Sequence, residues 1–209
     1  MGKLISPKCK QCRREGVKLL LKGDKCQTAK CPIIRRNYAP GVHGAKNKKR
    51  PTEYGNQLRE KQKAKRIYGI LEKQFHNYYV KATKMAGDSQ ENIKRLLEMR
   101  FDNIIYRAGF AKSRNMARQM VGHGLLMVNG KKVSIPSYQV KAKDEISIKG
   151  EKIKSKIFTE LEKALENKDT VSWMHVDPKN LKIKVLNAPK ADDLEQNFNP
   201  RLIIEFYSK

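Results

Sequence analysis

The chain has 209 residues, enough for one large or two small domains, and it carries a formal net charge of +25 at pH 7. Few partners other than nucleic acid or an anionic membrane surface tolerate so large a positive charge. The start, MGKLISPKCK, lacks the apolar segment of a secretory signal, and no stretch approaches the roughly 18 apolar residues of a membrane span. We therefore expect a cytoplasmic protein with reduced thiols and no membrane partner.

The positive charge is concentrated near the N-terminus. Residues 1–50 carry a net charge of +13, residues 51–100 carry +5, residues 101–150 carry +6 and residues 151–209 carry +1. We expect nucleic-acid contacts to concentrate in the first of these segments and around residues 100–132.

All four cysteines lie in the first 31 residues, in the pattern Cys9-x2-Cys12 and Cys26-x4-Cys31. Two close pairs separated by a loop suit a tetrahedral site of four thiolates, and zinc is the predicted ion. An iron–sulfur cluster also uses four thiolates and is the alternative metal centre. Two disulfides are disfavoured by a reducing compartment, and four unrelated thiols by the paired spacing. A metal would replace the apolar core that this segment lacks.

Turn-forming residues follow the cysteines. The stretch from Tyr38 to Gly44 breaks the chain before the helices. Residues 46–50, KNKKR, form either a solvated linker or an arm that contacts phosphate. His43 lies between glycines in this basic region, but on this evidence we assign no role to any histidine.

A helical pattern begins at Thr52 and is interrupted at Gly69. The next helix is predicted by a strong apolar stripe: Leu71, Phe75, Tyr78, Tyr79, Ala82 and Ala86. We interpret its tyrosines as core residues rather than as base-stacking residues. Ile93, Leu96 and Leu97 indicate a further helix.

Residues 99–141 predict two short helices and a hairpin. In the first helix an apolar stripe is formed by Phe101, Ile104, Ile105 and Ala108. Arg100, Asn103 and Arg107 are expected on its other side, and Gly109 can take the left-handed conformation that ends it.

The second helix is predicted to begin after Ser113 as its N-cap. Arg114 and Arg118 are four residues apart and should share an exposed face, while Met116, Met120 and Val121 face inward. Asn129-Gly130 is the preferred pair for the tight turn of the following hairpin. A compact unit with surplus cations on one side is suited to binding a polyanion.

In the C-terminal part, a strand is predicted at Ile146 and Ile148, and a helix at Phe158, Leu161 and Leu165. Residues 171–176 and 181–185 predict a hairpin, and residues 192–195 a short acidic helix. The apolar end at residues 202–207 must dock on another element.

Residues 99–141, MRFDNIIYRAGFAKSRNMARQMVGHGLLMVNGKKVSIPSYQVK, resemble the small RNA-binding domain named after small-subunit ribosomal protein four. Residues 53–75, EYGNQLREKQKAKRIYGILEKQF, and the ending LIIEFYSK are similar to other parts of that family, and the cysteine spacing fits its zinc-bearing form. Because these separated matches cover nearly the whole chain, it is identified as a member of the bacterial-type family.

The resemblance implies an α+β fold with an inserted domain. Residues 1–45 would form a zinc-binding basic segment, and residues 46–98 a helical domain completed by residues 187–209. The insertion, residues 99–186, would be a small RNA-binding domain in which two short helices pack on an antiparallel sheet.

The function implied by the resemblance is that of a structural constituent of the small ribosomal subunit in the cytoplasm. Such a protein binds rRNA directly, clamps the 5′ domain, nucleates assembly and lies near the mRNA entry path and the translational-accuracy region. Its neighbours include small-subunit protein number five. We expect phosphate contacts from basic residues in two groups. They are Arg13, Arg14, Arg35, Arg36, Lys48, Lys49 and Arg50, and Arg100, Arg107, Lys112, Arg114, Arg118, Lys131 and Lys132.

No catalytic site and no small-molecule substrate are expected. The four histidines have no metal or triad spacing, and the chain has neither a phosphate-loop nor a Rossmann glycine pattern. An RNA-modifying enzyme with a similar small domain is a rival interpretation, disfavoured because the rest of the chain leaves no room for a catalytic domain. A free RNA-binding regulator is a second rival, and it would be substoichiometric on small subunits.

Overall fold

The computed structural model describes residues 6–46, 50–150 and 171–208, together with Phe158, Leu161 and Leu165. By its internal contacts the chain divides into two compact units. Unit 1 comprises residues 1–94 and 195–209, and unit 2 comprises residues 95–194. None of the helices in the described ranges combines the length and the apolar character needed to cross a membrane.

Unit 1 is helical in its described part. Its elements are α1 (Lys8–Glu15), the 3-10 turn η1 (Gly23–Cys26), α2 (Pro32–Arg35), α3 (Glu53–Tyr68), α4 (Glu72–Lys84), the first part of α5 (Ser89–Glu98) and α9 (Pro200–Tyr207). Thr52 caps α3, since its Oγ1 accepts a hydrogen bond of 3.2 Å from the amide of Gly55. Gly69 ends the helix in the left-handed conformation, with φ +65°.

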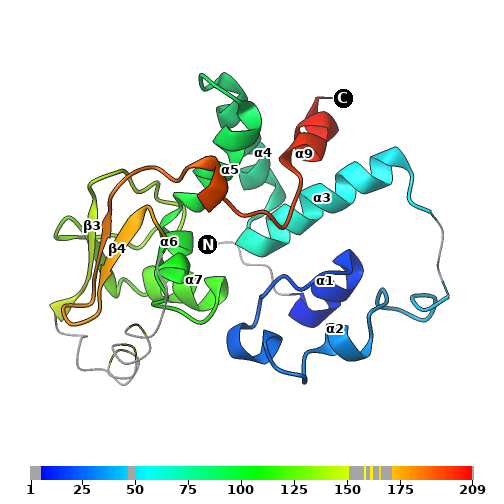
Figure 1. Ribbon diagram of the computed structural model, residues 1–209, viewed down its shortest axis with the longest axis horizontal. Coiled ribbons are helices and arrows are strands. Elements are labelled where there is room, and N and C mark those ends of the chain that lie inside the picture. The colour runs from blue at the N-terminus through cyan, green and yellow to red at the C-terminus, as the bar shows by residue number, and fades with distance from the viewer. Residues whose placement is uncertain are drawn as a thin grey trace. The chain divides into compact units, whose positions relative to one another are not determined.

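The C-terminal helix α9 packs against α3 and α4, as Figure 1 shows for the red and cyan ribbons. Ile203 on its inner face is fully buried. At the end of the helix the hydroxyl of Tyr207 donates a hydrogen bond of 2.6 Å to Glu72 on α4. The apolar residues near the C-terminus are therefore covered by elements from the other end of the same unit.

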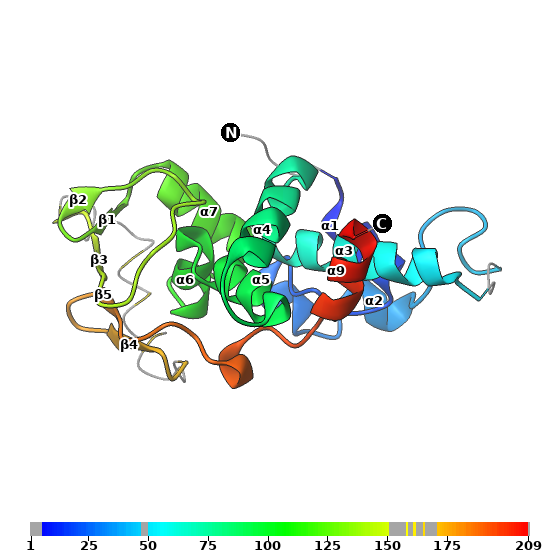
Figure 2. The same ribbon diagram turned by 90° about the horizontal axis from the view of Figure 1, so that it is seen from above.

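Unit 2 places helices α6 (Phe101–Arg107) and α7 (Arg114–Gly122) beside a five-stranded antiparallel sheet in the order β2-β1-β3-β5-β4 (Figures 1 and 2). The strands are β1 (Leu126–Val128), β2 (Lys131–Lys132), β3 (Glu145–Ile148), β4 (Met174–Asp177) and β5 (Lys182–Val185). Leu126, Ile146 and Ile183 are fully buried in the core between helices and sheet. The predicted combination of helices with an antiparallel sheet is confirmed.

The local signals in unit 2 behave as predicted. The Ser113 hydroxyl accepts a hydrogen bond of 3.3 Å from the amide of Met116, and Gly109 has φ +88°. Asn129 and Gly130 have φ +50° and +75°, as a tight hairpin turn requires. Phe158, Leu161 and Leu165 are helical and join the core.

Three details differ from the sequence-based expectations. The acidic helix expected at 192–195 is a short 3-10 turn, η3 (Ala191–Asp193). Leu71 and Ala86, at the two ends of the predicted apolar stripe, lie just outside α4 and are exposed. Within the helix, Phe75, Tyr78 and Ala82 are buried as expected.

Candidate nucleic-acid interface

Three of the cations predicted to contact RNA are exposed in unit 2, two on the hairpin and one before α7. Lys131 and Lys132 form β2, an edge strand of the sheet, and both are exposed. Lys112 precedes α7 and is also exposed. These three residues lie where a polyanion can reach them.

Arg100 does not lie on the surface, which corrects the expectation that it faces outward. Its side chain is fully buried, and its Nε and Nη2 donate hydrogen bonds of 3.0 and 2.7 Å to the two carboxylate oxygens of Asp102. Arg118 lies 3.7 Å from the same carboxylate, with a side chain only 12% exposed. Because a buried charge is stable only when paired, Asp102 holds both arginines within the domain.

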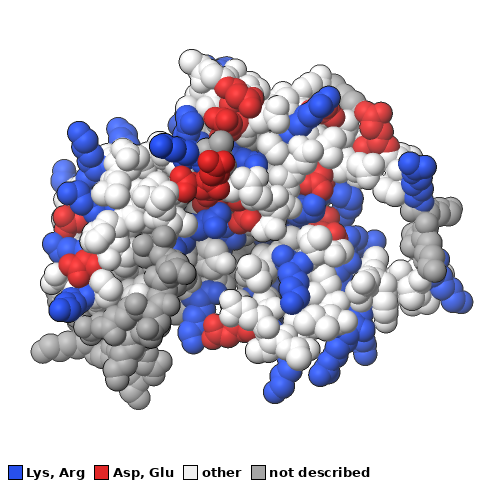
Figure 3. Space-filling view, viewed as in Figure 1, with Lys and Arg blue, Asp and Glu red and all other residues white. Residues whose placement is uncertain are grey.

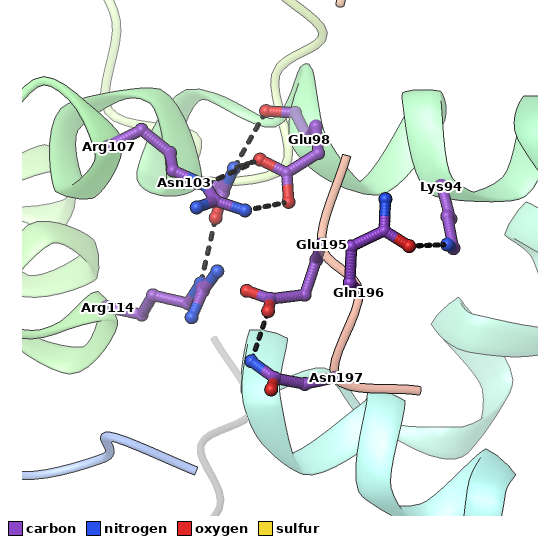
Figure 4. A network of polar contacts seen from close by, with 8 residues as sticks. All are labelled: Lys94, Glu98, Asn103, Arg107, Arg114, Glu195, Gln196 and Asn197. Carbon is purple, nitrogen blue, oxygen red and sulfur yellow. Dashed lines mark hydrogen bonds and ion pairs between the residues drawn. The ribbon is translucent and has the colours of Figure 1, made fainter. Parts of the chain in front are cut away.

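A second network is built around the fully buried carboxylate of Glu98 on α5 (Figure 4). Arg107 donates to both of its oxygens at 2.9 Å, and the amide of Asn103 donates to it at 2.7 Å. The Asn103 carbonyl oxygen accepts a hydrogen bond of 2.8 Å from Nε of Arg114, whose guanidinium lies 4.5 Å from the ring centre of Tyr106. The polar side of α6 therefore contacts other side chains of unit 2 rather than solvent, and Asn103 is buried rather than exposed.

Sequence reasoning missed Glu98 and Asn103 as organising residues. Helical spacing separates a polar face from an apolar one, but it does not show whether another element covers the polar face. An acidic residue just before a helix that carries arginines was the available signal. The inward orientation of Met120 and Val121 is confirmed, and Met116 packs against the core while remaining partly exposed.

In unit 1, Arg13 binds the backbone of the segment that follows α2. Its Nε donates to the carbonyl oxygens of Arg36 and Tyr38 at 3.1 and 3.0 Å, and its guanidinium lies 4.8 Å from the ring centre of Tyr38. Arg13 therefore acts within the protein. The remaining predicted cations of this segment that the structure describes are exposed: Arg14, Arg35, Arg36 and Arg50. Lys48 and Lys49 lie outside the described residues.

The four cysteines line a single pocket together with Lys8, Lys22 and Lys25. Cys12, Cys26 and Cys31 are buried, all four are free thiols, and the amide of Lys22 lies 3.3 Å from the Cys26 sulfur. Burial raises the pKa of the Cys12 thiol, and the three neighbouring thiols add to the effect against a hydrogen bond at Leu19. As they stand, no three potential ligands among the described residues are arranged to hold an ion.

Two family models match the chain. The model described as "Ribosomal protein S4/S9 N-terminal domain" covers residues 3–98, and the model described as "S4 domain" covers residues 99–146. Curated relatives named small ribosomal subunit protein uS4 align over their whole length and over all of this chain. They include those of Halothermothrix orenii at 51% identity, Caldicellulosiruptor bescii at 50% and Desulforamulus reducens at 48%.

The chain belongs to the uS4 family of small ribosomal subunit proteins. The uS4 family is structural rather than enzymatic, so the expectation that the chain is not an enzyme is confirmed. Within the two uS4 family matches, Glu98 is the last residue of the N-terminal match, and the S4-domain match begins at the next residue. Glu98 thus supplies the carboxylate that Arg107 of the S4 domain binds.

Proposed function

We propose that this chain is a structural, rRNA-binding constituent of the small ribosomal subunit in the cytoplasm. The observation that carries the proposal is that relatives named small ribosomal subunit protein uS4 are about half identical to it from end to end. The net charge of +25 supports an RNA partner. The chain should co-sediment with small subunits at one copy each, whereas a free regulator would be substoichiometric.

The mechanism we infer is positioning rather than chemistry. Exposed cations of both units bind phosphates and supply most of the affinity, while the shape of the RNA and its 2′-hydroxyls provide selectivity. The contacting residues are best sought among the exposed set: Arg14, Arg35, Arg36, Arg50, Lys112, Lys131 and Lys132. Arg107 and Arg118 support this surface by pairing with buried carboxylates, and Arg114 supports it through its hydrogen bond to the side-chain oxygen of Asn103.

We further propose that the rRNA site is the 5′ domain, that binding occurs early in assembly, and that the bound protein lies beside small-subunit protein number five, near the mRNA entry path. These proposals rest on family resemblance. Chemical footprinting of small-subunit rRNA, with and without the purified chain, tests the first, because protection confined to another rRNA domain would contradict it. Reconstitution with the chain withheld tests its early role.

We also propose a zinc ion held by Cys9, Cys12, Cys26 and Cys31, with an iron–sulfur cluster as the alternative. The proposal is supported by the convergence of the four thiols on one pocket and by three lysines around it, whose charge would offset that of four thiolates bound to a divalent ion. Binding would require the thiols to move closer together, because no three potential ligands among the described residues are arranged to hold an ion. The bound metal would cross-link α1, η1 and the start of α2, where apolar burial is sparse.

A further inference from the structure

A second pocket in unit 1 lies between α1, α3 and the loop formed by residues 39–44. Its volume is about 560 Å³, and it is lined by Arg14, Arg59, His43 and the other residues of that loop. None of the described lining residues is acidic. In Figure 3, Lys and Arg side chains (blue) predominate over Asp and Glu side chains (red) at the lower right of the face drawn. The pocket is in the size range of sites that bind small molecules.

The shape of the loop is fixed from within. A Cβ on Gly44 would lie 1.8 Å from the carbonyl oxygen of Ala39, so no other residue fits there without a backbone shift. The Gly44 amide donates a hydrogen bond of 3.1 Å to the carbonyl oxygen of Gly41, which has φ +111°. Arg13 holds the start of the loop through three carbonyl oxygens, the last that of Ala39 at 3.4 Å. The loop is thus preorganised rather than shaped by a partner.

The pocket also retains positive charge. Arg59 lies 3.3 Å from Glu15, whose carboxylate is fully buried, but Arg66 pairs with the same carboxylate. Two guanidinium groups share one negative charge, so this cluster keeps a net charge of +1. The exposed Arg14 adds a second positive charge, and its Nη2 lies 3.5 Å from the carbonyl oxygen of Pro40. Guanidinium groups match the oxygens of a phosphate well.

We propose that this pocket binds a phosphodiester of RNA, with Arg14, Arg59 and His43 contacting the phosphate oxygens. The proposal rests on the proposed function and identifies where one of its phosphate contacts is made. The volume leaves room for the attached ribose, and Val42, which is 91% exposed, offers an apolar contact at the rim. A free inorganic phosphate is the other source of the same chemistry, and the test below distinguishes the two.

The test measures the affinity of the full chain for purified small-subunit rRNA over a range of salt concentrations. The double variant Arg14→Gln/His43→Gln should raise Kd about tenfold and make the log–log salt slope shallower by about 0.7 for the lost phosphate contact. Arg201→Gln is the matched control, because this α9 side chain is 74% exposed and does not line the pocket, and it should change Kd less than twofold.

Gly44→Ala tests the contribution of the loop shape to binding separately from that of the positive charge. It leaves the net charge unchanged but displaces the loop, so it should weaken binding, whereas Gly150→Ala, where nothing lies within 4 Å of the added Cβ, should not. Thermal melting shows which variants are folded, and the exposed Arg14 and His43 keep the test valid if Gly44→Ala unfolds.

Three outcomes would overturn the inference. In the first, the Arg14/His43 variant binds like the wild type. In the second, it weakens binding no more than Arg201→Gln. In the third, the wild type binds inorganic phosphate in the pocket while loss of the pocket leaves rRNA affinity unchanged. Failure of the wild type to bind rRNA at all would instead refute the proposed function.

Discussion

The guanidinium of Arg107 donates two hydrogen bonds to the buried carboxylate of Glu98, from Nε to Oε2 and from Nη2 to Oε1, each at 2.9 Å. The Glu98 side chain is fully buried, whereas the Arg107 side chain is 22% exposed. The arginine therefore serves as a counter-ion of a carboxylate that is shielded from solvent. Removing the arginine alone would leave the buried charge without this bidentate partner, which is the costly way to break such a pair.

Arg107→Gln should destabilise unit 2 by about 3 kcal/mol, near the lower end of the cost of breaking a buried pair. Urea unfolding followed by the fluorescence of Trp173, the single tryptophan and a core residue of this unit, measures the change. Adding Glu98→Gln to the variant should restore part of the loss, because the buried charge is then gone. The exposed Lys112→Gln is the control, and an Arg107→Gln variant as stable as this control would contradict the prediction.

Replacing both Arg114 and Arg118 with glutamine should lower stability as well as rRNA affinity. The structure places both side chains in contacts with α6, so roughly 1–3 kcal/mol of unfolding free energy should be lost. Met120→Asp, which buries an unpaired charge, should unfold the unit altogether. Thermal melting and rRNA binding measured on the same samples separate the two effects. A double variant that melts like the wild type yet binds weakly would show that these arginines act only at the RNA surface.

The stability of unit 1 should fall between pH 4.5 and pH 2 through Glu72. Partial burial would raise its pKa, but hydrogen bonds from Lys61, Tyr207 and Lys65 outweigh this and lower the pKa from 4.5 to about 2. A carboxyl with a lowered folded-state pKa stabilises the fold above its unfolded pKa and loses that contribution as the pH falls through the folded value. Its side chain is 46% exposed, so the contribution should be only about 1 kcal/mol.

Glu72→Gln should therefore melt below the wild type at pH 6 and converge with it near pH 2, as followed by far-UV circular dichroism. Glu205→Gln removes the exposed pair with Arg201 and should have a smaller effect at pH 6. A difference between Glu72→Gln and the wild type that stays constant from pH 6 to pH 2 would show that the cluster acts by packing alone.

The rRNA affinity should depend steeply on salt, with each neutralised phosphate adding about −0.7 to −0.9 to the log–log slope. Lys131→Gln/Lys132→Gln, on the exposed edge strand β2, should make that slope shallower without lowering the melting temperature. Filter binding between 50 and about 300 mM salt gives both slopes, over a range in which such contacts lose most of their affinity. A wild-type slope near zero would place the basic residues away from the RNA.

The purified chain should contain one zinc per molecule, and Cys12→Ser should abolish stoichiometric binding. Amide hydrogen exchange should then increase in residues 6–45, while the unit 2 core around Trp173 remains protected. Elemental analysis of freshly prepared protein measures the metal, with iron as the alternative result. Protein free of both metals, yet fully protected in residues 6–45, would refute the site.

The elements that could be predicted were those with local causes. Ser113, Gly109 and the Asn129-Gly130 turn act through their own backbone geometry, so their spacing predicted where α7 begins, where α6 ends and where the hairpin reverses. The spacing of the cysteine pairs likewise indicated that they act as a group, and in the structure all four line one pocket. Exposure of individual arginines was not predictable in this way, because it depends on which carboxylate folds against them.

The sequence alone determined the family, the two helices and hairpin of the small domain, and the excess of positive charge, since these follow from residue order, spacing and composition. Only the tertiary structure decided the roles of the cations. Arg100 is buried against Asp102, Arg107 is bound to Glu98 and Arg13 holds a backbone loop, whereas Lys131 and Arg14 remain at the surface. The physical reason is that burying a carboxylate requires a cation beside it, and that requirement arises only when distant segments pack together.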